Sequence, residues 1–161
     1  MSIFPTKILL ATDGSEEAEL AALRAVDVAQ NTDSELHVVH VGAVPTLLLS
    51  YPGTLGYDRK LYEQIEEESR ELLRKESGQV KAAGGTVAGT HLRMGVVDLE
   101  IASLAKELGV GLIVMGCRGH RGIRRAIEGS ISNAVIRHAP CPVLVVRSEE
   151  TNGASFVRAD R

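Results

Sequence analysis

Short apolar runs and longer segments of helical periodicity alternate along the chain, and no other feature constrains the fold as strongly. In the first helical segment Ala18, Ala22, Ala25 and Ala29 recur every three or four residues, which predicts one buried helix face. Strands that alternate with helices favour a parallel sheet with right-handed crossovers and helices on both faces. We therefore expect a doubly wound α/β domain with a five-stranded parallel sheet, and we assume the strand order 3-2-1-4-5. The expected strands are 7–11, 35–41, 86–93, 110–115 and 143–147.

Length and composition fit one domain with an aliphatic core. The chain has 161 residues, of which only 3% are aromatic, so Val, Ile, Leu and Ala must fill the interior. We expect the domain to span residues 1–147 and residues 148–161 to form a flexible tail. A net charge of −3 argues against a general nucleic-acid binder. No apolar run reaches membrane-spanning length and residues 1–7 lack the pattern of a secretory signal, so we expect a cytoplasmic protein.

Helix ends and helix faces give further expectations. Ser15 can cap the first helix, and Asp98 is a candidate cap for the helix that stops at Gly109. A long charged helix over about 60–83 is expected to turn apolar residues inward and glutamates outward. Residues 43–58 are irregular and could form a lid, a partner contact or a mobile connector. The apolar residues expected on the inner face of the long helix are Leu61, Ile65, Leu72, Leu73 and Val80.

A glycine-rich segment from Gly116 to Ser130 joins the fourth strand to the last helix. Glycines let backbone N–H groups approach a ligand closely, and the first turn of a helix offers unpaired donors at the positive end of its dipole. The segment lacks the lysine of G-x-x-x-x-G-K-[ST], although its arginines and its histidine could approach phosphate. Glycines after strands are also common turn formers. The basic residues of the segment are Arg118, His120, Arg121, Arg124 and Arg125.

A second turn, Thr12-Asp13-Gly14, follows the first strand and faces this segment if the assumed strand order holds. Ligands of doubly wound sheets bind at the carboxyl ends of strands where the winding reverses, here between the first and fourth strands. Asp13 could instead only stabilise the turn before Ser15. The histidines show no metal-ligand spacing, which argues against a structural zinc site. Cys117 and Cys141 are expected at opposite ends of adjacent strands, too far apart for a disulfide.

The spacing G-x2-G-x9-G-S, fixed between a strand and a helix, resembles the nucleotide-binding motif of the universal stress protein family. Residues 7–15 resemble the family's opening strand and loop, and residues 139–146 resemble its closing strand. The resemblance implies a Rossmann-like fold, usually a homodimer, in whose ATP-binding members this glycine pattern is intact.

The resemblance also assigns roles within a nucleotide site. It implies that residues 116–119 and 129–132 wrap the ribose and phosphates, and that the backbone of Val41 meets the adenine. Ala11 and Thr12 would line the floor, and Asp13 would face the ribose or a divalent metal. The implied site comprises Ala11, Thr12, Asp13, Val41, Met115, Gly116, Arg118, Gly119, His120, Gly129, Ser130, Ile131 and Ser132.

We therefore predict an ATP-binding universal stress protein, a nucleotide-dependent sensor or switch with little or no hydrolysis, because no nucleophile and base pair stands out. Mg²⁺ or Mn²⁺ would accompany the nucleotide, with Asp13 as its candidate ligand, and AMP or cyclic AMP are alternatives to ATP. Two other functions stay open: a dimeric interaction module independent of nucleotide, and a slow ATPase or phosphotransferase. The expected homodimer forms through the last strand, whose residues are Val143, Leu144, Val145 and Val146.

Overall fold

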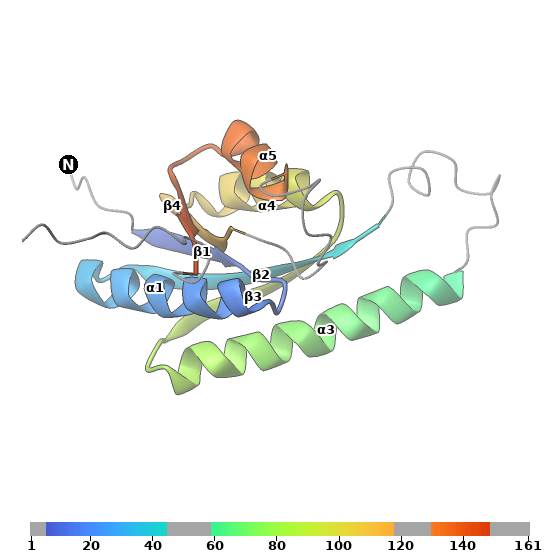
Figure 1. Ribbon diagram of the computed structural model, residues 1–161, viewed down its shortest axis with the longest axis horizontal. Helices are drawn as coiled ribbons and strands as arrows, with labels where there is room; N and C mark the ends of the chain where they lie inside the picture. Colours follow the sequence, from blue (N-terminus) through green and yellow to red (C-terminus); the bar gives the residue numbers. More distant parts are fainter. Residues whose placement is uncertain (1–5, 45–58, 118–129, 149–161) are drawn as a thin grey trace, which may run out of the picture.

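The computed structural model describes residues 6–44, 59–117 and 130–148, which form a sheet covered by helices on both faces (Figure 1). Each expected strand is present, with ends that differ from the prediction by a few residues. Among the helices of these three ranges, none combines the length and the apolar composition needed to cross a membrane. The elements are β1 (Lys7–Ala11), α1 (Glu16–Thr32), β2 (Glu35–Ala43), α3 (Arg59–Ala82), β3 (Val87–Gly95), α4 (Val97–Leu108), β4 (Leu112–Gly116), α5 (Ser130–His138) and β5 (Val143–Val146).

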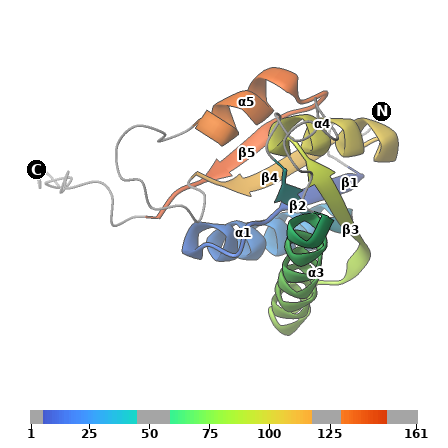
Figure 2. The ribbon, with the colours of Figure 1, turned by 90° about the vertical axis from the view of Figure 1, so that its right-hand side faces the viewer.

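The strands form one parallel five-stranded sheet in the order β3-β2-β1-β4-β5, which confirms the predicted fold class and strand order (Figure 2). β1 lies in the middle, with Ala11 opposite Val39 of β2 and Met115 of β4. The polar strand β3 and the short strand β5 are the two edges of the sheet. The winding therefore reverses between β1 and β4, and the loops after these strands open at the same end of the sheet.

Two hydrophobic clusters, one on each face of the sheet, hold the layers together (Figure 2). Because side chains alternate along a strand, Leu10 joins the cluster under α1 and α3, whereas Leu9 joins the cluster under α4 and α5. Small residues bring α1 close to the sheet, and Ala21 and Ala25 are fully buried. Aliphatic strands and an alanine-lined helix thus form a core with few aromatic rings.

The helix ends agree with the sequence prediction at two positions and differ at a third. The Ser15 hydroxyl accepts a hydrogen bond from the Ala18 N–H at 3.1 Å, which caps α1. Gly109 ends α4 in the left-handed conformation with φ of 67°. The prediction that Asp98 caps α4 is wrong, because the helix already begins at Val97 and has no side-chain cap.

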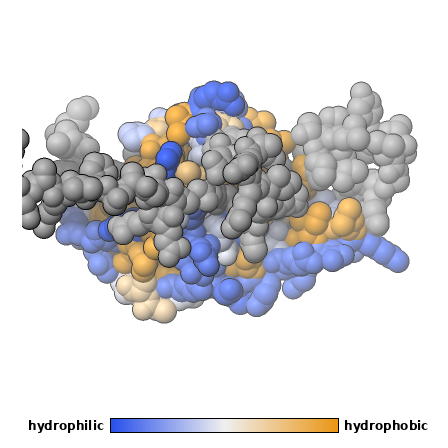
Figure 3. Space-filling model, in the orientation of Figure 1, coloured by the Kyte–Doolittle hydropathy of each residue, from blue (hydrophilic) through white to orange (hydrophobic). Residues whose placement is uncertain are grey.

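Helix α3 is placed as predicted, but its inner face differs from the prediction. Leu61 is 45% exposed, because the first half of α3 runs past the end of the sheet (Figure 1). Ile65 and Leu72 are only partly buried, whereas Leu73 and Val80 lie in the core as expected. The rest of the helix surface is predominantly hydrophilic, as the lower edge of Figure 3 shows.

One glutamate of α3 contradicts the expectation that the glutamates of this helix point outward. Glu76 is only 2% exposed. It lies three residues after Leu73 and four before Val80, so the helical repeat places it on the inner face.

Candidate functional site

The ends of β1 and β4 lie side by side, and this contact organises the candidate site. Ala11 is paired in register with Met115, so Thr12 and Asp13 continue from β1 beside Gly116. The sequence-predicted residues Ala11, Thr12, Asp13, Met115 and Gly116 are thus neighbours at the carboxyl end of the sheet. This is the end at which doubly wound sheets bind their ligands.

Val41 is brought to the same end by β2. The pairing between β1 and β2 ends at Ala11 and Val39, followed by a hydrogen bond from the Thr12 N–H to the Val39 carbonyl at 3.0 Å. Val41 lies two residues beyond that last pair, and its side chain is 7% exposed. Because the side chain belongs to the core, a ligand at this edge would meet the backbone of Val41.

The turn between β1 and α1 is held by local hydrogen bonds. The Asp13 Oδ1 atom accepts from the Ser15 N–H at 3.0 Å, and the Gly14 N–H donates to the Thr12 Oγ1 atom at 3.3 Å. Gly14 has φ of +77°, a backbone conformation that residues other than glycine rarely adopt. Asp13 therefore does stabilise this turn, and its side chain is half-buried.

Gly116 is required by packing as well as by any ligand. A Cβ atom at this position would lie 2.8 Å from the Glu17 carbonyl carbon and 3.0 Å from the Ala18 nitrogen. The end of β4 therefore lies directly against the first turn of α1. The glycine at this position has a structural cause that the sequence pattern alone did not reveal.

The remaining predicted site residues divide between the start of α5 and the undescribed segment. Ser130 begins α5, Ile131 is 43% exposed and Ser132 is 5% exposed. The first turn of α5 contains no acidic residue that would offset the positive end of its dipole. Four predicted residues, Arg118, Gly119, His120 and Gly129, lie outside the described residues, as do the segment 45–58 and the tail from 149.

Two residues that the sequence did not single out contact Thr12. The Thr12 hydroxyl donates to the Glu76 Oε2 atom at 2.9 Å, and the His40 Nδ1 atom lies 2.7 Å from the Thr12 carbonyl oxygen. Thr12 itself is 5% exposed. The inward position of Glu76 in the helical repeat of α3 was the signal that could have identified it.

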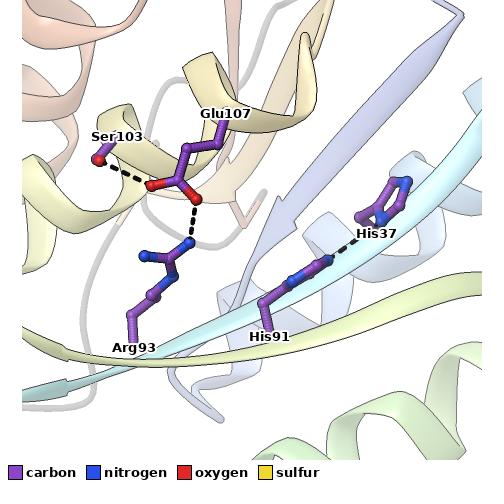
Figure 4. A network of polar contacts seen from close by, with 5 residues as sticks. All are labelled: His37, His91, Arg93, Ser103 and Glu107. Carbon is purple, nitrogen blue, oxygen red and sulfur yellow. Dashed lines mark hydrogen bonds and ion pairs between the residues drawn. The ribbon is translucent and has the colours of Figure 1, made fainter.

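A separate polar cluster lies between β2, β3 and α4 (Figure 4). The His37 Nδ1 and His91 Nε2 atoms are 3.2 Å apart, although the two residues are 54 positions apart in sequence. Arg93 forms an ion pair with Glu107, which also accepts a hydrogen bond from the Ser103 hydroxyl at 3.3 Å. The hydrogen bond from Arg93 lowers the pKa of the exposed Glu107 carboxyl.

The surroundings of His91 disfavour its charged form. Burial, then the nearby His37 and Arg93, lower the pKa of His91, and only Glu107 opposes them. Gly89 makes room for the pair, because a Cβ atom there would lie 2.9 Å from the His37 Nδ1 atom. Across the three described ranges, no group of three or more residues has the arrangement of a metal site.

The two cysteines are apart and free. Cys117 follows β4, and Cys141 precedes β5. Burial raises the pKa of the Cys141 thiol, which favours its protonated form.

Comparison with known proteins assigns the chain to a family. The model of the universal stress protein family matches residues 5–147. A Staphylococcus haemolyticus protein assigned to the universal stress proteins is 43% identical over 144 residues, which cover 89% of this chain and 85% of the relative.

Solved structures agree with this assignment. A universal stress protein from Lactobacillus plantarum aligns with a TM-score of 0.75 at 27% identity, over 91% of this chain and 100% of that chain. The universal stress protein from Archaeoglobus fulgidus in complex with dAMP aligns with a TM-score of 0.60 at 23% identity, over 90% of this chain and 99% of that chain. From its sequence match and its sheet topology, the chain belongs to the universal stress protein family.

Proposed function

We propose that this chain binds an adenine nucleotide, with ATP as the principal ligand, at the carboxyl ends of β1 and β4. The nucleotide would enter with Mg²⁺ or Mn²⁺ and act as the signal of a cytoplasmic stress-response sensor or switch, with little or no hydrolysis. One observation carries the proposal: the Thr12–Asp13 turn, Val41 and Gly116 lie at one end of the sheet, and along the chain α5 is the next helix after Gly116.

Charges suggest how a nucleotide would be oriented there. The first turn of α1 contains Glu16, Glu17 and Glu19, which offset the positive end of its dipole. The first turn of α5, beginning at Ser130, has no acidic residue, so it is the better place for phosphate groups. A divalent metal bound by Asp13 would reduce the repulsion between the phosphates and these glutamates, which is a reason to expect Mg²⁺ or Mn²⁺ with the nucleotide.

The base would occupy the opposite part of the site. Val41 continues β2 past the last residue of β1, so the backbone at this edge can hydrogen-bond a planar ring. The Archaeoglobus fulgidus structure with dAMP supports an adenine ligand at the level of the fold. Because AMP, cyclic AMP and ATP share the adenosine and first phosphate, all three are candidates.

The second candidate function is a dimeric interaction module that binds no nucleotide. The packing of Gly116 against α1 favours it, because this glycine has a purpose without any ligand. Both candidates include a homodimer formed by β5, an edge strand on which Leu144 is 38% exposed. They differ only in whether a nucleotide binds.

Nucleotide binding can be tested on the purified full chain. Acid release from fresh protein identifies a carried nucleotide, and calorimetric titration with ATP, AMP and cyclic AMP, each with and without Mg²⁺, ranks the ligands. We expect saturable ATP binding that Mg²⁺ strengthens. Absence of binding to all three ligands would favour the interaction module.

A variant in the glycine segment locates the binding site. Gly119→Val places a side chain where the backbone is expected to approach phosphate, so ATP binding should be lost while the apo protein stays folded. Gly78→Val is the matched control, because a Cβ atom at Gly78 meets no atom within 4 Å. Retained ATP binding in Gly119→Val would contradict the proposed position of the phosphates.

A further inference from the structure

Helix α3 contacts the β1–α1 turn at two points on one helix face. Glu76 accepts a hydrogen bond from the Thr12 hydroxyl at 2.9 Å. Four residues earlier, Leu72 lies against Gly14, where a Cβ atom would be 2.6 Å from the Leu72 Cδ1 atom. Positions four apart lie one above the other on a helix, so both contacts come from the same face of α3. The turn that carries Asp13 is thus docked on α3.

The hydrogen bonds of Thr12 explain what this docking does. Its hydroxyl donates to Glu76 and accepts from the Gly14 N–H, while its carbonyl faces the His40 Nδ1 atom at 2.7 Å. The side chain of Thr12 is therefore held on the α3 face of the sheet. These hydrogen bonds fix the backbone at Thr12 and therefore the position of the next residue, Asp13.

Glu76 is placed at a cost to folding. It is 2% exposed, and within the described part of the chain its Oε1 atom has no hydrogen-bond partner. A buried carboxyl group with one donor stabilises a fold less than an apolar side chain of similar size would. The contribution of Glu76 is therefore to hold the Thr12 side chain in place rather than to stabilise the fold.

We propose that Glu76 is a positioning residue of the nucleotide site, which fixes the Thr12–Gly14 turn for ligand binding and links site occupancy to the packing of α3. This inference rests on the nucleotide binding proposed above. Since coupling between binding and conformation is reciprocal, a nucleotide that needs the fixed turn must also strengthen the contact between the turn and α3.

A double-mutant cycle tests the proposal on the full chain. Nucleotide dissociation constants are measured for the wild type, Thr12→Val, Glu76→Leu and the double variant, with Mg²⁺ and ATP as the probe. Each single variant should weaken ATP binding about tenfold, the effect of one buried hydrogen bond. The double variant should bind ATP no more weakly than Thr12→Val alone, because Thr12→Val already removes the bond to Glu76 and, in addition, the acceptor of the Gly14 N–H. Glu76→Gln retains an acceptor oxygen and should bind within about threefold of the wild type.

Controls separate positioning from general destabilisation. Ser77→Ala changes the neighbouring residue, which is 6% exposed and likewise lacks a side-chain partner among the described residues, and should leave ATP affinity unchanged. Leu104→Ala removes core volume on the face of the sheet opposite α3 and should lower the melting temperature without changing ATP affinity at a temperature where the protein is folded.

Amide hydrogen exchange of Gly14 in the ligand-free protein keeps the test independent of nucleotide binding. The Gly14 N–H should exchange faster in Glu76→Leu than in Ser77→Ala, because its acceptor, the Thr12 hydroxyl, is no longer held by Glu76. Wild-type affinity in Glu76→Leu, or additive losses in the double variant, would overturn the positioning role while leaving nucleotide binding intact. If the wild type binds no nucleotide, the proposed function fails, and unchanged Gly14 exchange would overturn the docking as well.

Discussion

Replacing Gly116 by alanine should destabilise the ligand-free protein. The new Cβ atom would lie 2.8 Å from the Glu17 carbonyl carbon, whereas ordinary van der Waals contact begins at 3.4 Å. The backbones of β4 and α1 must therefore separate by about 0.6 Å, the difference between these distances, and neither can yield by rotating a side chain. Overpacking of this kind costs about 1–3 kcal/mol.

An opposing contribution comes from the unfolded chain. Alanine restricts the unfolded state more than glycine does, which returns about 0.4–1 kcal/mol. Gly116 does not have a positive φ, so alanine meets no backbone strain there. The midpoints of these two ranges leave a net loss of about 1.3 kcal/mol in the free energy of unfolding. For a domain of this length, each kcal/mol lowers the melting temperature by about 2–4 °C, so we expect a decrease of about 3–5 °C.

Thermal unfolding of the nucleotide-free protein, followed by circular dichroism, provides the assay. Gly78→Ala is the control, because Gly78 lies exposed within α3 with open space at its Cβ position. That substitution should instead stabilise the protein by about 0.5–1 kcal/mol. If Gly116→Ala melts at or above the wild-type temperature, the close packing of β4 on α1 is refuted.

Two further predictions concern the histidine pair and the edge strand. The pKa of His91 is lowered in the folded state. Below the ordinary value of 6.5 the unfolded chain therefore binds more protons than the folded protein, and the free energy of unfolding should decrease as the pH drops through the folded pKa of His91. Urea unfolding at pH 7.5 and 5.5 should show this loss, and a His91→Gln variant with the same loss would contradict it. Leu144→Lys places a charge on the edge strand β5 and should shift a homodimer to monomer in light scattering, whereas Leu99→Lys on the 50% exposed position of α4 should not. Equal effects of the two lysine variants would argue against β5 as the interface.

The sheet could be predicted from sequence because its signals are local and repeated. Apolar strands such as 7–11 and 143–146 are short, end at turn residues and alternate with helical patterns. Ser15 was identified as a cap because its hydroxyl acts within three residues of chain. The neighbouring positions of Thr12 and Gly116 followed from the strand order, which was assumed and is now confirmed.

What could not be predicted depends on contacts distant in sequence. Leu61 fits the apolar repeat of α3, but it is exposed because the first half of this helix runs past the end of the sheet, and the helical repeat gives no information on where the sheet ends. Asp98 was expected to be a cap, yet it contacts the His138 Nδ1 atom at 2.8 Å across 40 residues. Glu76 was expected on the outer face with the other glutamates of this helix, and its partner Thr12 lies 64 residues away in the sequence.

The residues that would surround the phosphates are the part of the site that stays a prediction. Gly119 and Gly129 were assigned by resemblance to a family motif, and they lie outside the described residues. In the described half of the site, Ala11 to Asp13, Val41 and Gly116 lie at the same end of the sheet, and their contact with a nucleotide likewise stays a prediction.

Calorimetric titration of the nucleotide-free full chain with ATP in the presence of Mg²⁺ tests the central claim most directly. The account predicts one saturable ATP site for each chain, weakened when Mg²⁺ is omitted and lost in Gly119→Val but not in Gly78→Val. Absence of binding in the wild type, or equal binding in both glycine variants, would contradict it.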